Sequence, residues 1–311
     1  MRHPIDPKID CVFKALLGAE DNCGLLIHFL NAMLGGELPA PVTAVEILNP
    51  YNEREFLTDK LSIVDVKARD DQGRFYQIEI QLRPHADLPA RILYTWADLY
   101  SQQLQSGQDY GLLRPTYSIW LLGDDLLVDD AAYAHRYRLR DERGRCLLDH
   151  GGIVLFELSK FAAEAVDSEE QRWLKFFKEG ERLDADRLPE WMQTDEMRQA
   201  MSTLKAFSEK EHAYDAYQAR QNYLRVQDSI ERRQRELEQA LAQERAAREA
   251  ERQAREIALQ EKEVERQARE VALQEKEVER QAKEAALAEI ARLKALLRAN
   301  PPPGVGEPRL R

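Results

Sequence analysis

The stretch that decides the fold is residues 60–83, KLSIVDVKARDDQGRFYQIEIQLR, in which two alternating runs flank the turn-forming residues 70–73, DDQG. Two such runs around a turn of this composition predict a β-hairpin. Successive side chains of a strand point to opposite faces, so each run has an apolar face and a polar face. The apolar face includes Val64, Val66, Ala68, Tyr76, Ile78, Ile80 and Leu82, and the polar face includes Asp65, Lys67, Gln77, Glu79 and Gln81.

The register of this hairpin places two carboxylates together. The apolar faces coincide only if paired residue numbers have an even sum, and a sum of 144, which closes on the Gly73 turn, sets Asp65 opposite Glu79. Like charges that face each other across strands destabilise a sheet by up to about 1 kcal/mol. A divalent cation would convert this repulsion into ligation, because Mg²⁺ is typically bound by one or two carboxylates together with water and phosphate oxygens. The alternative is a solvent-facing hairpin whose charges only keep the protein soluble.

Asp65, followed on the next strand by Glu79-x-Gln81, resembles the core of the PD-(D/E)XK nuclease superfamily. The flanking sequence resembles its Rpn branch, the recombination-promoting nucleases that are also described as transposases. Further pieces match in the same order along roughly residues 4–225. They are Asp10-x-x-Phe13-Lys14, Arg91-x-x-Tyr94 through Tyr100 to Gly107-x-x-Tyr110, and residues 156–161, FELSKF.

The resemblance implies a PD-(D/E)XK-like α/β core, a mixed central sheet flanked by helices, and a Mg²⁺- or Mn²⁺-dependent endonuclease that hydrolyses DNA, linked to recombination or transposition. It further implies that Asp65 and Glu79 hold the metal. Asp10, on the first helix, is the candidate third ligand, although an i,i+4 ion pair with Lys14 is the more economical interpretation of its position.

One position departs from the family pattern, because the lysine expected two residues after the second carboxylate is Gln81. Lys67 lies on the same predicted face as Asp65 and diagonal to Glu79, so its ammonium group is a candidate replacement. The alternatives are that Gln81 itself holds the attacking water, and that Lys67 only neutralises nearby carboxylates. The candidate catalytic residues are therefore Asp65, Glu79, Gln81 and Lys67.

Composition limits the function classes. The 311 residues are 43% hydrophobic and 32% charged, which is enough to bury a core. The net charge of -11 argues against tight non-specific DNA binding by counterion release, but it is compatible with an enzyme that binds phosphate through a metal ion.

Cys11, Cys23 and Cys146 form no CxxC pair, so we expect buried thiols and neither disulfides nor a zinc site. No apolar run reaches the roughly 18 residues of a membrane span and residues 1–10, MRHPIDPKID, lack the apolar region of a signal peptide, so we expect a cytoplasmic protein.

Around the hairpin, the pattern predicts the order of a minimal nuclease core. Asp6-Pro7 starts a first helix with an apolar stripe, and Arg91, Tyr94 and Gln103 on a later helix are either phosphate contacts or part of an apolar face. The other predicted elements are a helix at 22–34, an edge strand at 42–48, a helix at 90–104, a buried strand at 116–122, strands at 133–139 and 153–158, and helices through 169–223, with Trp173, Phe176, Phe177 and Trp191 as their core. Glu157 and Lys160 are expected to form a structural ion pair.

Residues 251–292 contain a 14-residue repeat, ERQAREIALQEKEV, in which Ile257, Val264, Val271 and Val278 recur every seventh position. The alternate seam positions hold Glu261 and Glu275, and buried glutamates weaken a coiled coil. With no Gly or Pro in residues 218–300, we expect an exposed helix on the order of 100 Å long that projects from the domain and self-associates weakly at best.

The predicted organisation is a nuclease core at 1–165, a helical cap at 166–225, an extended charged helix at 226–298 and a disordered tail at 299–311. DNA is the expected partner. The rival interpretation is a catalytically degenerate nuclease fold that acts as an interaction or scaffold protein through its C-terminal helix.

Overall fold

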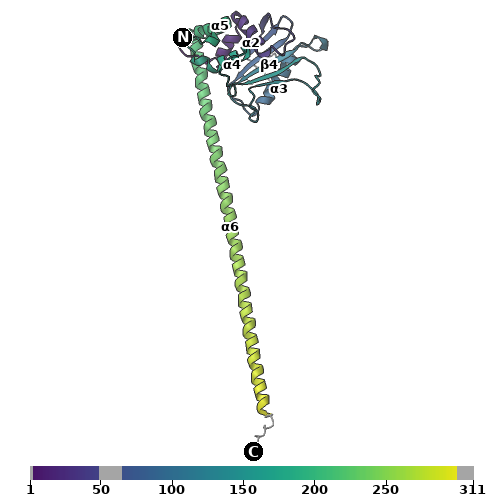
Figure 1. Ribbon diagram of the computed structural model, residues 1–311, viewed down its shortest axis with the longest axis vertical. Helices are drawn as coiled ribbons and strands as arrows, with labels where there is room; N and C mark the ends of the chain where they lie inside the picture. The colour runs from purple at the N-terminus through teal and green to yellow at the C-terminus, as the bar shows by residue number, and fades with distance from the viewer. Residues whose placement is uncertain (1–2, 49–64, 300–311) are drawn as a thin grey trace, which may run out of the picture. The chain divides into compact units, whose positions relative to one another are not determined.

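The computed structural model describes residues 3–48 and 65–299 (Figure 1). The chain forms two compact units, Met1–Val226 and Gln227–Arg311, which are considered separately below. Residues 60–64, the start of the predicted hairpin, lie outside the described part.

The central hairpin forms in the predicted register. Strands β2 (Val66–Asp70) and β3 (Phe75–Gln81) are antiparallel, and their partners, from Val66↔Ile78 onward, all sum to 144. The predicted register is therefore confirmed. The turn uses Gly73 at φ +79°, a conformation that side chains disfavour, and the Asp70 carboxylate accepts the backbone N–H groups of Gln72 and Arg74.

The hairpin belongs to a six-stranded mixed sheet with the order β1-β2-β3-β4-β6-β5. The β3–β4 and β4–β6 pairs are parallel, and the remaining pairs are antiparallel. The remaining strands are β1 (Val45–Leu48), β4 (Thr116–Leu122), β5 (Ala134–Tyr137) and β6 (Gly151–Glu157). As predicted, β1 is an edge strand and β4 is buried along its whole length, which is typical of a strand covered on both faces.

Helices cover both faces of this sheet, so the fold is mixed α/β (Figure 1). On one face, the main core combines the apolar side of the sheet with α1 (Asp10–Leu17), α2 (Cys23–Leu34), α4 (Glu169–Glu179) and α5 (Asp195–Glu209). On the other face, α3 (Leu88–Ser101) buries Leu88 and Ile92 against Trp120, Leu122 and Leu155. The face that carries Glu79 is thus the α3 face.

The helices after the sheet extend the main core. Trp173, Phe176 and Phe177 of α4 are fully buried, whereas Trp191 is half-buried. The ring of Phe177 lies 5.5 Å from that of Phe13 in α1, and the ring of Trp173 lies 5.4 Å from that of Phe29 in α2. These aromatic contacts join α4 to the helices before the sheet in one hydrophobic core.

Three local expectations were wrong. The first helix begins at Asp10, because the Asp6 carboxylate accepts the Lys8 N–H and the Asp6 carbonyl accepts the Ile9 N–H, which closes a turn before the helix. The apolar face of the helix expected at 90–104 is narrower than predicted, because Leu93 of α3 is 58% exposed. Cys146 is exposed, whereas Cys11 and Cys23 are half-buried.

Helix α6 (Glu211–Ala299) begins within the first unit and forms the described part of the second. From Arg232 to Leu296 the side chains are exposed, including the Ile257, Val264, Val271 and Val278 line. Ion pairs run along the helix surface, for example Glu263 to Arg266 and Glu277 to Arg280, both at 2.7 Å. Within the described chain, no helix combines the length and apolarity needed to cross a membrane.

Candidate active site

Glu79 is a carboxylate placed inside the sheet. It occupies the middle of β3, pairs in register with Trp120 of β4, and is 3% exposed beneath α3. Burial, and secondly the charge of Asp65, raises the pKa of Glu79 to about 8. Its Oε1 is buried and has no hydrogen-bond partner among the described residues.

Asp65 is a bend residue directly before β2, and the last pair of the ladder next to it is Val66↔Ile78. Its Oδ2 accepts the backbone N–H of Ile80 at 2.9 Å, and its side chain is 12% exposed. Burial raises the pKa of Asp65, against the lowering effects of that N–H and of Lys14. The structure thus brings together two buried acids, and the charge of Asp65 contributes to the raised pKa of Glu79.

Asp10 and Lys14 of α1 form ion pairs with other residues instead of the expected ion pair with each other. Arg220 Nε of α6 lies 3.1 Å from Asp10 Oδ2, and Lys14 Nζ lies 3.4 Å from Asp65 Oδ1. Asp10 is near enough to raise the pKa of Asp65. Among residues 3–48 and 65–299, however, no group of three or more His, Cys, Asp or Glu side chains is arranged to hold a metal ion. Asp10 therefore stands beside the pair without completing a three-ligand cluster.

Gln81 lies two residues after Glu79 on the same face of β3, and its amide is engaged. Its Nε2 donates to the Arg83 carbonyl at 2.9 Å, and its Oε1 accepts from Arg91 Nη1 at 3.4 Å. Arg91 Nη2 lies 3.6 Å from Glu79 Oε2, and its guanidinium lies 5.6 Å from the centre of the Trp120 ring. Arg91 of α3 thus places a permanent positive charge next to Glu79.

The other two candidate phosphate contacts differ from Arg91. Gln103 holds the backbone of Arg114, because its Nε2 donates to the Arg114 carbonyl and its Oε1 accepts the Arg114 N–H. Tyr94 is 46% exposed on the outer side of α3. Of the three, only Arg91 has a described contact with the site.

Lys67 is half-buried and faces Gln77 across the hairpin, diagonal to Glu79 as its register predicts. Gln77 is fully buried, and neither polar atom of its side chain has a hydrogen-bond partner within the described residues. Nearly all buried polar groups are bonded to protein, water or ions. The polar face of β3 therefore carries unmet hydrogen-bonding capacity at both Gln77 and Glu79.

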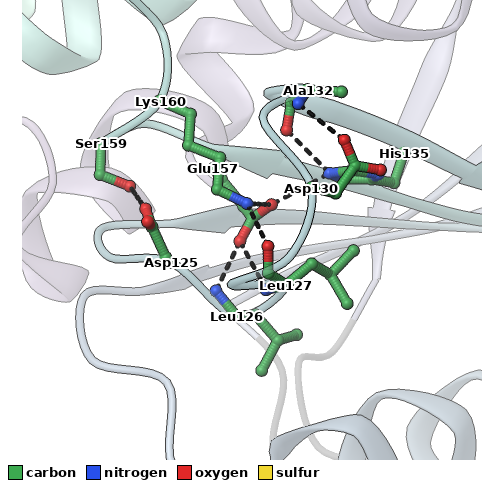
Figure 2. A network of polar contacts seen from close by, with 9 residues as sticks. All are labelled: Asp125, Leu126, Leu127, Asp130, Ala132, His135, Glu157, Ser159 and Lys160. Atoms are coloured by element: carbon green, nitrogen blue, oxygen red, sulfur yellow. Dashed lines mark hydrogen bonds and ion pairs between the residues drawn. The ribbon is translucent and has the colours of Figure 1, made fainter.

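Glu157 shows the opposite arrangement at the end of β6 (Figure 2). Its carboxylate accepts the backbone N–H groups of Leu126 and Leu127 and lies 2.7 Å from Lys160 Nζ and 3.0 Å from His135 Nε2. Although burial raises the pKa of Glu157, the hydrogen bonds from Lys160 and from the two backbone groups outweigh it and lower that pKa.

The predicted Glu157–Lys160 ion pair is confirmed, and the network anchors the β4–β5 connection to the end of β6. Sequence reasoning missed His135, because nothing in its local pattern indicates a partner 22 residues later. Both oxygens of this carboxylate have hydrogen-bond partners, in contrast to Glu79.

Comparison with known proteins adds a family. The family model described as PD-(D/E)XK nuclease family transposase matches residues 7–234. No curated protein and no solved structure matches the chain. The matched range includes the whole sheet, α1 through α5 and the start of α6, and so contains Asp10, Asp65, Glu79 and Arg91.

Proposed function

Because the chain belongs to the family described as PD-(D/E)XK nuclease family transposase, we propose that it is a metal-dependent endonuclease. In this proposal it hydrolyses phosphodiester bonds in DNA during recombination or transposition. The observation that carries this proposal is the buried pair of Asp65 and Glu79, with one Glu79 oxygen lacking any described partner.

The donor set fits Mg²⁺ or Mn²⁺. Both ions prefer oxygen ligands, and the pair offers carboxylate oxygens that accept few hydrogen bonds from the protein. Lys14 and Arg91 lie 3.4 and 3.6 Å from the two acids, yet Glu79 Oε1 is buried without a described partner, whereas the carboxylate of Glu157 is fully supplied with donors. We assign Asp65 and Glu79 as the metal ligands, with Asp10 as a nearby third acid. When bound, such an ion polarises the scissile phosphate and lowers the pKa of the attacking water.

The chain's own residues perform the remaining tasks. Arg91 is 39% exposed and lies between Glu79 and Gln81, so its guanidinium can bind a phosphate oxygen that approaches the pair. Gln81, held by the Arg83 carbonyl, keeps Arg91 in this position. For the positive charge of the missing motif lysine, the sequence offers Lys67 as a candidate, with Gln81 as the alternative holder of the attacking water.

The test is cleavage of supercoiled plasmid by the purified protein with Mg²⁺, with Mn²⁺ and with chelator. We expect nicking that requires the metal and disappears in Asp65→Asn and Glu79→Gln. Glu46→Gln is the matched control, since Glu46 is also a strand carboxylate in an ion pair but lies on β1, paired with Arg69. Cleavage that survives both site variants, or that persists in chelator, would refute the assignment.

The scaffold alternative is favoured by one feature, the 89-residue helix α6 with its exposed Ile/Val line. It predicts that the wild-type protein cuts no DNA under any metal condition and that function depends on α6 alone, through a protein partner or a weak homo-oligomer. The plasmid assay distinguishes the two functions directly.

A further inference from the structure

We propose that Lys14 of α1 supplies the positive charge that the PD-(D/E)XK motif places two residues after the second carboxylate, where this chain has Gln81. The inference rests on the proposed nuclease function. Lys14 Nζ lies 3.4 Å from Asp65 Oδ1, and its side chain is 42% exposed, so the ammonium group reaches both the carboxylate pair and an approaching substrate.

The packing of α1 fixes this position. Val12, Phe13, Leu16 and Leu17 are buried in the main core, which leaves Lys14 on the side of the helix that faces Asp65. At the end of the helix, a Cβ on Gly18 would lie 2.9 Å from the Lys14 carbonyl oxygen and 3.3 Å from Cγ2 of Val66. The absence of a side chain therefore allows α1 to approach the residue that follows Asp65, which brings Lys14 to the site.

Two other cations, Arg91 and Lys67, lie near the pair in different positions. Arg91 contacts Glu79 and Gln81 and lies over the Trp120 ring, so its guanidinium is engaged on the Glu79 side of the pair. Lys67 faces Gln77, two residues further along the hairpin from the Asp65 position. Lys14 has a described contact with a carboxylate of the pair itself, through a flexible stem and three N–H donors. In this role its ammonium orients the attacking water or stabilises charge that develops on the phosphate.

The rival role is that of a counter-ion, in which Lys14 only neutralises Asp65 in the metal-free protein. The two roles predict different effects of removing the ammonium group on Mn²⁺ affinity and on kcat. A counter-ion competes with the metal, so Lys14→Met would tighten Mn²⁺ binding and leave kcat at saturating metal unchanged. A group that acts in the chemistry lowers kcat when it is removed, even though metal binding is not weakened, because its contribution arises in the transition state.

The experiment combines Mn²⁺ titration calorimetry with plasmid cleavage at saturating Mg²⁺ for Lys14→Met, Lys14→Arg and Lys67→Met. The control is Lys205→Met, because Lys205 is 45% exposed and pairs with Asp186 at 3.7 Å, much as Lys14 pairs with Asp65. We expect Lys14→Met to lower kcat about a hundredfold without weakening Mn²⁺ binding, and Lys14→Arg to recover part of the loss. Melting curves check that each variant is folded.

The inference is overturned if Lys14→Met keeps wild-type kcat, or if Lys67→Met alone causes the loss. It is equally overturned if the Lys14→Met defect disappears on raising Mg²⁺, since that outcome assigns Lys14 to metal occupancy. If the wild type binds Mn²⁺ but does not cleave DNA, the proposed nuclease function is wrong, and so is the role of Lys14 in that function.

Discussion

The backbone N–H of Ile80 donates to Asp65 Oδ2 at 2.9 Å, which ties the carboxylate of one acid to the residue that follows the other. We predict that Asp65→Asn abolishes metal-dependent cleavage without lowering the melting temperature. Asparagine keeps an oxygen for the Ile80 N–H and removes a negative charge that burial disfavours, so the metal-free fold loses little. Thermal melting in chelator, alongside plasmid nicking, measures both effects. A melting temperature several degrees lower would assign Asp65 a structural role.

The pKa of Glu79 makes stability depend on pH in a defined direction. Its folded-state pKa of about 8 exceeds its ordinary value of 4.5, so the folded protein binds the proton more tightly than the unfolded chain. Stability from this group is complete below about pH 4.5 and is lost as pH rises through about 8. Glu79→Gln cannot ionise, and we predict that its metal-free melting temperature, relative to wild type, increases steadily between those limits. Parallel curves for the two proteins would contradict the raised pKa.

The extent to which sequence predicts this site depends on how far apart its parts lie in the chain. The register of β2 and β3, from Val66↔Ile78 onward, was predictable because strand alternation and the Gly73 turn fix which residues can pair. The contacts of Lys14 with Asp65 and of Arg91 with Glu79 were not, because they depend on how α1 and α3 dock on the sheet. Periodicity indicates which face of a helix is buried, but it does not indicate which strand that face covers.

The start of α1 shows a local limit of the same reasoning. Asp6 followed by Pro7 matches a helix start, yet the Asp6 carboxylate accepts the N–H of Lys8 and the helix begins only at Asp10. Asp side chains stabilise both caps and turns by the same hydrogen bond, so residue type alone does not distinguish the two. Ile5 and Ile9, on either side of this turn, are buried in the main core.

Arg91 provides a test of substrate binding. We predict that Arg91→Ala lowers kcat/KM on DNA about 10- to 100-fold, because hydrogen bonds to charged groups contribute about 1.5–3 kcal/mol. Arg91→Lys keeps the charge but loses the planar fork, so it should recover only part of the activity. Arg69→Ala is the control, since Arg69 is a similarly exposed arginine paired with Glu46 on the hairpin's outer edge. If Arg69→Ala and Arg91→Ala lower kcat/KM equally, the effect comes from general surface charge and not from a specific contact of Arg91.

Glu157 should behave as a structural acid. It is fully buried, and its carboxylate is bonded to Lys160, His135 and two backbone N–H groups (Figure 2). Removing one partner of a buried ion pair costs about 3–5 kcal/mol, so we predict that Glu157→Gln lowers the free energy of unfolding by about 3 kcal/mol. Cleavage per folded molecule should not change, because the network lies at the end of β6, outside the Asp65–Glu79 pair. Urea unfolding monitored by tryptophan fluorescence measures the first effect. Loss of cleavage in a fully folded variant would assign Glu157 to the site.

The second unit provides the last prediction. Its Ile257, Val264, Val271 and Val278 line is exposed, and the alternate seam positions include Glu261 and Glu275, whose burial in a coiled coil would cost more than the apolar line gains. We therefore predict that the full chain sediments as a monomer or a weak oligomer at micromolar concentration. A chain that ends at Val226 keeps the first compact unit, Arg220 included, and should retain metal-dependent cleavage. A stable dimer or trimer that dissociates on truncation would show that the Ile/Val line outweighs the glutamates. Loss of cleavage in the truncated chain would make α6 part of the enzyme.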